Sequence, residues 1–271
     1  MLNALHGAFS TLSNAIEPQV ALVDATISSK QGLTTRLGVI TPDDAVNDDE
    51  YYNYVPPGVT LLWTRYRTPR RFEPISVEMV SSYGDLDVIR EAALTLQITR
   101  PHATLFSCNS CGFVHGPAGD QNIRQVIAEA AGCEATSVTS SQIHALRTLN
   151  LKRVAVGAPY APELTAKLVS YLESSGFVVT ATLSLGLKTE WEIGNSLPTV
   201  WADLARQVNS ASAECVLLAC SGIRTAIVLD GLEQELGKPV LSAPAVAMWH
   251  TLRLAGVQAQ MPGRGILLKE H

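Results

Sequence analysis

Two cysteines stand at matching places in two similar stretches of this 271-residue chain. Residues 103–110 are Ala-Thr-Leu-Phe-Ser-Cys-Asn-Ser and residues 215–222 are Cys-Val-Leu-Leu-Ala-Cys-Ser-Gly. Each pattern is typical of a buried strand that breaks into a turn directly after Cys108 or Cys220, at the strand edge where α/β sheets bind ligands. If the two stretches face each other, the thiols meet across one cleft, where they can act on one carbon from two sides as nucleophile, acid or base.

The surroundings of Cys220 favour a reactive thiol. Residues 217–225 predict a strand, a tight turn and the start of a helix. The positive end of a helix dipole and nearby backbone N–H groups stabilise a thiolate, and the N–H groups of Ser221 and Gly222 can also hold a carboxylate. The alternative is a buried, inert cysteine, which we accept for Cys215 inside the predicted strand.

Cys108 is followed by Asn109 and Ser110, whose amide, hydroxyl and backbone donors suit an anionic ligand. The Cys108–Cys111 spacing is also that of a redox pair or half a zinc site. No second pair of cysteines follows and only His115 stands near, so the sequence predicts no metal and leaves a redox pair as a minor alternative.

An earlier pair of similar stretches, residues 36–42 and 153–159, ends in a proline in each half of the chain. Tyr160 follows the second stretch and is a candidate hydroxyl donor to a substrate carboxylate. Pro42 forms the matching turn, and Asp43 directly after it is a candidate substrate contact. The rest of the acidic segment 43–50 is expected to be a solvated loop.

Apolar stretches predict strands, and segments with apolar spacing of three and four predict helices. The strands are expected at 35–41, 59–64, 103–108, 153–158, 177–183, 214–220 and 239–242, and the helices at 84–98, 119–131, 139–149, 161–175, 197–210, 224–236 and 244–255. Alternation of this kind predicts parallel sheets covered by helices, and the internal similarity predicts a duplicated unit.

The predicted fold is therefore α/β, with two pseudo-symmetric Rossmann-like lobes, each a parallel sheet flanked by helices, and an active site in the cleft between them. Residues 1–136 plus 241–271 are expected to form the first lobe and residues 137–240 the second. Residues 1–34 are an N-terminal extension with apolar clusters, which we expect to pack on a neighbouring subunit or on the first lobe, so a homo-oligomer is predicted.

Composition excludes several classes of function. The net charge is −5 with scattered basic residues, which argues against nucleic acid as a partner. No apolar run reaches the roughly 18–20 residues that span a bilayer. Five cysteines without a secretory signal predict a cytoplasmic location. Nucleotide-binding glycine motifs and a G-x-S-x-G elbow are absent from the sequence, and we expect no cofactor.

Three segments together resemble one known group of proteins: residues 107–116, 218–225 and 240–256. They are similar to the aspartate/glutamate racemase superfamily, and within it to the branch of maleate cis–trans isomerases and arylmalonate decarboxylases. The resemblance runs from about residue 36 to 268. It implies two pseudo-symmetric α/β lobes, an active site between them, and chemistry without a metal or organic cofactor.

Within that branch, the resemblance implies an isomerase or racemase, because decarboxylases have glycine at the first cysteine position whereas this chain has both Cys108 and Cys220. There are two departures. Asn109 stands where the isomerases tend to have threonine, and Glu190 stands where they have a substrate-binding asparagine. A carboxylate at 190 repels a dicarboxylate unless Lys188 or Arg224 compensates, which leaves open a substrate with an amino or amide nitrogen.

We therefore predict a cofactor-independent isomerase of a small carboxylate. In the maleate-like version Cys108 adds to the alkene and Cys220 supplies and recovers a proton, while the carboxylate is held by Asn109, Ser110, Tyr160, Ser221 and Gly222. The alternatives are an amino-acid or hydantoin-type racemase with the same two cysteines, an arylmalonate-decarboxylase-like enzyme, and an inactive binding homologue.

Overall fold

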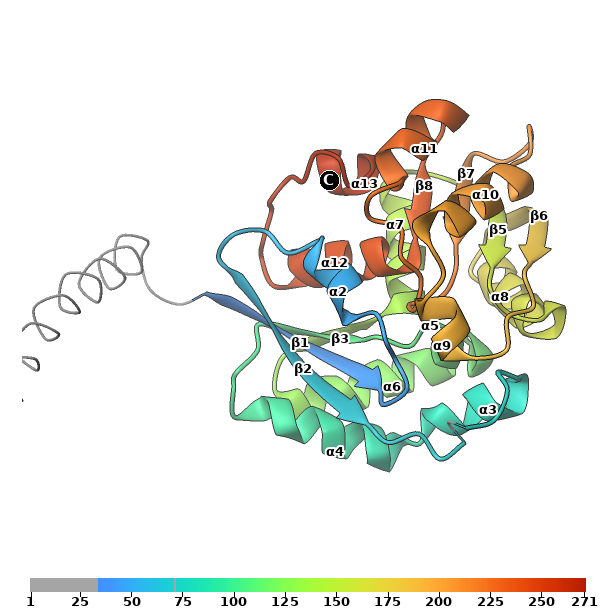
Figure 1. Ribbon diagram of the computed structural model, residues 1–271. Coiled ribbons are helices and arrows are strands. Elements are labelled where there is room, and N and C mark those ends of the chain that lie inside the picture. The colour runs from blue at the N-terminus through green and yellow to red at the C-terminus, as the bar shows by residue number, and fades with distance from the viewer. Residues whose placement is uncertain (1–33, 71) are drawn as a thin grey trace, which may run out of the picture. The chain divides into compact units, whose positions relative to one another are not determined.

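The computed structural model describes residues 34–70 and 72–271, and Thr35–His271 form one compact unit (Figure 1). The predicted N-terminal extension lies outside the described residues except for Thr34, so its packing stays a prediction. No helix in the described part of the chain is long and apolar enough to cross a membrane.

Two parallel four-stranded sheets form the core of this unit. In the first sheet the order is β2 (Val59–Tyr66), β1 (Thr35–Pro42), β3 (Ala103–Phe106) and β4 (Glu134–Ser137). In the second it is β6 (Val178–Ser184), β5 (Arg153–Ala158), β7 (Cys215–Leu218) and β8 (Val240–Ser242). Corresponding strands occupy corresponding places, so the predicted α/β fold with two pseudo-symmetric halves is confirmed.

The strands that lead to the two cysteines are buried along their whole length. Every residue of β3 and of β7 is buried, because each strand lies inside its sheet between two partners. Strands of parallel sheets are covered on both faces and therefore carry continuous rather than alternating apolar residues. β3 ends at Phe106 and β7 at Leu218, two residues before Cys108 and Cys220.

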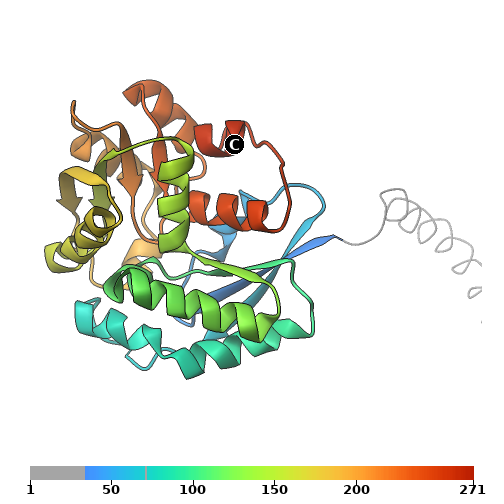
Figure 2. The ribbon, with the colours of Figure 1, turned by 180° about the vertical axis from the view of Figure 1, so that it is seen from behind.

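Helices cover both sheets. In the first half α4 (Leu86–Gln97) and α6 (Gly116–Ala131) pack side by side along the first sheet (Figure 2). In the second half α8 (Pro162–Ser174) and α10 (Pro198–Val208) pack on β5 and β6, and α11 (Leu229–Leu236) packs on β8. Shorter helices are α2 (Asp48–Tyr52), α3 (Val77–Ser81), η1 (Ser82–Gly84), α5 (Asn109–Val114), α9 (Glu190–Gly194) and α13 (Ile266–Glu270).

The chain passes between the two sheets through a pair of helices. α7 (Val138–Thr148) follows β4, α12 (Ala243–Leu254) follows β8, and the two helices pack against each other. α12 also contacts β3 and β4, so the last part of the chain packs on the first sheet. Leu241 and Ser242 still pair with β7 in the second sheet, one to two residues beyond the predicted boundary at 240. The division into two domains itself stays a prediction.

The acidic segment 43–50 is not the solvated loop that its charge pattern predicts. Residues 48–52 form α2, and Glu50 is buried at 4% exposure. Its carboxylate accepts hydrogen bonds from the N–H groups of Thr225 and Ala226, at 2.8 and 2.9 Å, and from the Tyr54 hydroxyl. Burial raises the pKa of Glu50. This carboxylate therefore holds the loop after β7 against the first half of the chain, a tertiary contact that local charge does not indicate.

Candidate active site

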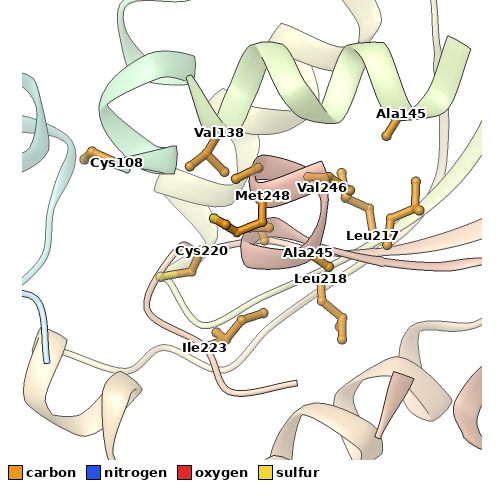
Figure 3. Close-up of a cluster of buried hydrophobic side chains, with 14 of the residues drawn as sticks. Cys108, Val138, Ala145, Leu217, Leu218, Cys220, Ile223, Ala245, Val246 and Met248 are labelled. Carbon is orange, nitrogen blue, oxygen red and sulfur yellow. The ribbon is translucent and has the colours of Figure 1, made fainter. Parts of the chain in front are cut away.

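Cys108 and Cys220 line the same small cavity, about 20 Å³ in volume, between the ends of β3 and β7. Such a volume has room for about one water molecule. The other lining residues are Thr41, Pro42, Asp44, Ala45, Asn47, Tyr83, Ser107, Ser110, Glu190, Ser221 and Gly222. Figure 3 shows both cysteines at the border of a buried apolar cluster that includes Val138 of α7 and Met248 of α12. The arrangement brings the two predicted cysteines to one site.

Cys108 is the residue that precedes α5, and its side chain is 4% exposed. Its sulfur lies 3.9 Å from the Ser110 hydroxyl oxygen. A hydrogen bond from the Cys111 thiol lowers the pKa of Cys108 against the opposing effect of burial, and the same bond raises the pKa of Cys111. The hydrogen bond between the two cysteines of the C-x-x-C motif thus favours ionisation of Cys108 before Cys111. Sequence reasoning left Cys111 without this role.

Cys220 has the opposite electrostatic setting. Burial and the negative charge of Glu190 raise the pKa of its thiol well above the ordinary value. The N–H group of Gly222 points at its sulfur from 3.3 Å. The backbone of Cys220 has φ +86°, in the left-handed region that non-glycine residues rarely adopt. Two thiols whose environments move their pKa values apart are suited to different roles, one as nucleophile or base and the other as acid.

The turn after Cys220 is held from the first half of the chain. Asn47 donates a hydrogen bond to the Ser221 carbonyl over 2.8 Å, and the Tyr51 hydroxyl donates to the same oxygen over 3.3 Å. Tyr51 also bonds the Ser107 hydroxyl at 2.6 Å, directly before Cys108. Sequence reasoning missed Asn47 and Tyr51, because both stand in a segment whose charge resembles a solvated loop.

Asn109 does not line the cavity that its position after Cys108 suggests. Its side-chain oxygen accepts hydrogen bonds from the Cys220 N–H at 2.9 Å and from the Gln142 amide at 3.2 Å. Its side-chain nitrogen donates to Gln142 at 3.1 Å and to Thr139 at 3.3 Å. These contacts use both donors and both lone pairs of the amide. Asn109 therefore joins α7 to the Cys220 turn and is not among the residues that line the cavity. Its contact with the substrate carboxylate stays a prediction.

The other predicted carboxylate donors surround the thiols. Ser110, Ser221 and Gly222 line the cavity, as does Pro42. Tyr160 lies beside Cys220 with 1% exposure, and its hydroxyl has no hydrogen-bond partner within the described residues. Burial and the nearby thiol charge raise the pKa of Tyr160. Its hydroxyl therefore stays protonated and can donate to an anion.

Of the two adjacent aspartates after the turn, Asp44 lines the cavity, whereas the predicted contact Asp43 does not. The Asp43 carboxylate accepts hydrogen bonds from the backbone N–H and the hydroxyl of Thr68, at 3.1 and 2.7 Å. Asp44 accepts one from the Tyr83 hydroxyl through Oδ2, whereas its Oδ1 is buried without a partner among the described residues. Burial raises the pKa of Asp44. The sequence predicts an acidic pair after the turn, but the hydrogen bonds from Thr68 to Asp43 decide which of the two lines the cavity.

Glu190 is the first residue of α9, a helix that Thr189 and Glu192 cap reciprocally. A Cβ built on Gly222 would stand 3.1 Å from Glu190 Oε2 and 3.5 Å from the Cys220 sulfur, so Gly222 lies between the two groups without filling the space. Burial, with the negative charges of Asp44 and Cys108, raises the pKa of Glu190 to about 8. Glu190 thus lies in the cavity wall, and its contact with the substrate stays a prediction.

Arg224 does not compensate this carboxylate. Its guanidinium group donates to the carbonyl oxygens of Gly194 and Val46, at 2.7 and 3.1 Å, and pairs with Asp49. Neither Arg224 nor Lys188 lines the cavity. Within residues 34–70 and 72–271, no three His, Cys, Asp or Glu side chains gather as a metal site requires.

Comparison with known proteins agrees with this geometry. The family model for arylmalonate decarboxylase matches residues 73–268, and the chain belongs to this family. Arylmalonate decarboxylase of Bordetella bronchiseptica is 29% identical over 89% of this chain and 99% of its own length. Maleate isomerase of Nocardia farcinica is 27% identical over 87% of this chain and 96% of its own length.

Solved structures share the fold. A cysteine-to-serine variant of Nocardia farcinica maleate cis–trans isomerase, which carries a covalently bound succinylcysteine intermediate, superimposes with a TM-score of 0.80 at 23% identity, covering 89% of this chain and all of that one. A liganded double mutant of arylmalonate decarboxylase gives a TM-score of 0.79 at 22% identity, covering 88% of this chain and all of that one. At these identities the likeness concerns the fold.

Proposed function

We propose that this protein is a cofactor-independent isomerase of a small carboxylate, with Cys108 as nucleophile and Cys220 as acid and base. The observation that carries the proposal is the pair of buried thiols, with opposite pKa shifts, that line one cavity at equivalent strand ends. A succinylcysteine intermediate in a relative of the same fold supports sulfur–carbon bond formation as the chemistry.

The proposed reaction balances without any further reactant. The Cys108 thiolate adds to one alkene carbon, the π electrons move to the adjacent carbon, and that carbon takes a proton from the Cys220 thiol. The new single bond rotates. The Cys220 thiolate then removes a proton from the same carbon, the carbon–sulfur bond breaks, and the trans alkene leaves while both thiols return to their starting forms.

Neutral donors stabilise the charge that develops on the substrate during this sequence. The Ser110 hydroxyl and the turn at Ser221 and Gly222 line the cavity, and the unpartnered Tyr160 hydroxyl lies beside Cys220. Pro42 lines the same cavity. Asn109 contributes by fixing the Cys220 turn through its hydrogen bond to the Cys220 N–H.

A racemase with the same two cysteines is the second candidate, and the acidic wall of the cavity favours it. Asp44 and Glu190 suit a substrate with a nitrogen next to the reacting carbon. In this version one cysteine removes the proton from the α-carbon and the other returns one to the opposite face.

Proton NMR of the purified protein with maleate in the presence of EDTA tests the proposal, with α-deuterium incorporation into amino acids and 5-substituted hydantoins as the second arm. We expect turnover that disappears in Cys108→Ser and in Cys220→Ser and persists in the control Cys133→Ser. A fully active Cys108→Ser would remove both two-cysteine mechanisms and leave a decarboxylase. Absence of turnover on every substrate, with free thiols confirmed, would indicate a binding homologue.

We also propose a cytoplasmic location and a homo-oligomer. Support for the first is the set of free cysteines among the described residues, which suits a reducing compartment. Support for the second is the apolar sequence of residues 1–34. Light scattering of the full chain beside a form that lacks residues 1–30 tests the assembly.

A further inference from the structure

The wall of the two-thiol cavity is acidic. Asp44 and Glu190 line it, and none of its lining residues among the described part of the chain is Lys, Arg or His. A dicarboxylate would bring two further negative charges to a cavity that is lined by these two carboxyl groups and by both thiols. Above the pKa of Glu190, about 8, the ionised carboxyl groups oppose such a ligand, because like charges repel strongly where water is excluded.

Asp44 presents an acceptor that the protein leaves unsatisfied. Tyr83 donates to Oδ2 and fixes the carboxyl group, while Oδ1 is buried with no partner in the described residues. A buried acceptor without a donor is destabilising, and the protein gains when a ligand supplies one. Because a carboxylate ligand has no hydrogen to give, the missing partner is an N–H or O–H group.

Glu190 is aimed at the same space by the local backbone. Its helix is fixed by the cap at Thr189, and its Oε2 lies over Gly222, where a side chain would collide. No hydrogen bond from a described side chain reaches the Glu190 carboxyl group, and Arg224 is bound instead to Gly194, Val46 and Asp49. Asp44 and Glu190 therefore line the same cavity, close enough for the charge of Asp44 to raise the pKa of Glu190, and both have acceptor oxygens available.

The space continues beyond these two carboxyl groups. A second pocket of about 280 Å³ shares Asp44 and Glu190 with the cavity, and its remaining wall includes the apolar side chains of Val46, Ile75 and Met79. The acceptors thus stand at the junction between the reacting thiols and a larger apolar space. A substrate group bound there can carry a further apolar substituent without leaving the site.

We propose that the substrate carries an N–H group, bound by Asp44 and Glu190, in addition to its carboxylate. The inference rests on the proposed isomerase function and narrows its substrate from dicarboxylates to monoamides of unsaturated diacids or amino acids. An amide and an ammonium group both offer the N–H donors that the two carboxyl groups can bind.

Three saturated ligands of matched length, succinate, succinamate and 3-aminopropanoate, separate these possibilities without turnover. Their affinities for the full chain are measured by isothermal titration calorimetry at pH 9, where Glu190, with a pKa of about 8, is mostly ionised. We expect succinamate or 3-aminopropanoate to bind about 10-fold more tightly than succinate, the gain of about one charge-assisted hydrogen bond. The tighter of the two identifies the amide or the ammonium source. Equal or tighter binding of succinate would overturn the proposal.

Glu190→Gln and Asp44→Asn test the same point from the protein side, with the exposed Glu129→Gln on α6 as the matched control. We expect either variant to reduce the preference for the nitrogen ligand to within about 3-fold, since a carboxamide accepts and donates alike, whereas the control keeps it. Circular dichroism confirms folding, and an undiminished preference in both folded variants would contradict the assignment.

Turnover distinguishes the failure of this inference from the failure of the proposed function. If maleate is isomerised at least as efficiently as its monoamide, the function stands and the N–H assignment is wrong. The isomerase proposal is wrong if neither maleate nor its monoamide is isomerised and no amino acid exchanges its α-hydrogen, while succinamate still binds more tightly than succinate. The binding of an N–H group by Asp44 and Glu190 then still stands.

Discussion

The side-chain oxygen of Asn109 accepts a hydrogen bond from the backbone N–H of Cys220, over 2.9 Å, and so joins the turn after β3 to the turn after β7. The bond is buried, and Gln142 of α7 holds the other edge of the same amide. Cys220 has the left-handed φ of +86°, which is kept only where surrounding contacts determine it. Asn109 is thus part of what sets the direction of the Cys220 sulfur.

Asn109→Ala should lower kcat by about 10- to 100-fold with KM changed by less than about 3-fold, because a small displacement of a reacting group costs rate rather than binding. Gln142→Ala removes only the support of Asn109 and should give a smaller loss. Both changes in kcat and KM are measured by steady-state kinetics on whichever candidate substrate the wild type turns over, with the exposed Gln125→Ala as control. A change confined to KM would show that Asn109 binds the substrate itself.

Cys108 should react with iodoacetamide faster than Cys220 at pH 7, because the thiolate is the nucleophile and the pKa of Cys108 is lowered while that of Cys220 is raised. Timed alkylation followed by peptide mass spectrometry gives both rates. In Cys111→Ala the reaction of Cys108 should slow, since the thiol donor that lowers the pKa of Cys108 is removed. Faster labelling of Cys220 would reverse the assigned roles of nucleophile and acid.

Replacement of Cys220 should change the stability of the fold and the isomerase activity in different ways. Cys220→Gly relieves the left-handed strain, whereas Cys220→Ala retains it, so the glycine variant should be more stable than the alanine variant by about 1 kcal/mol. Both should be inactive as isomerases. Urea unfolding followed by fluorescence compares them directly. Equal stability would mean that the strain at this turn is relaxed in solution.

Glu190 should give stability a specific pH dependence. Its pKa in the folded protein, about 8, is raised from the ordinary 4.5, so the folded state holds a proton that the unfolded state has lost between these values. The stabilising contribution of Glu190 is therefore complete below pH 4.5 and is lost as the pH rises through 8. Asp44, Cys108, Cys220 and Tyr160 are the titratable groups that act on Glu190 or are affected by it.

The measurement is the free energy of unfolding between pH 5.5 and 9 for the wild type, Glu190→Gln and the control Glu129→Gln. The wild type should lose stability relative to Glu190→Gln as the pH rises, while Glu129→Gln follows the wild type. A constant difference between the wild type and Glu190→Gln over this range would show that Glu190 titrates normally.

The cysteines could be placed at strand ends from the sequence because each follows a buried strand, and the packing of the two halves of the chain brings those ends to one cavity. The same reasoning placed the residues near the strand ends at the site: Pro42, Ser110, Ser221 and Gly222. Strand β4 was missed because Glu134–Ser137 is short and polar, and its burial comes from β3 and α12. The short helix α5 was missed because its residues were interpreted as a ligand-binding turn.

The directions in which the side chains point could not be predicted from the sequence. Asp43 and Asp44 are adjacent and chemically alike, and the hydrogen bonds from Thr68 decide that Asp43 turns away. Glu50 is buried because two N–H groups of a distant loop meet it, and Asn109 faces α7 because Gln142 and Thr139 complement its amide. Each outcome depends on partners far along the chain.

The cavity between the thiols, with its volume of about 20 Å³, bears on the origin of the proton in the proposed reaction. With room for about one water molecule, the cavity beside Cys220 holds little solvent with which its thiol can exchange hydrogen. Hydrogen should then pass between Cys220 and the substrate carbon with little dilution by hydrogen from bulk water. Hydrogen from bulk water then reaches the thiol mainly when the site opens to release the product.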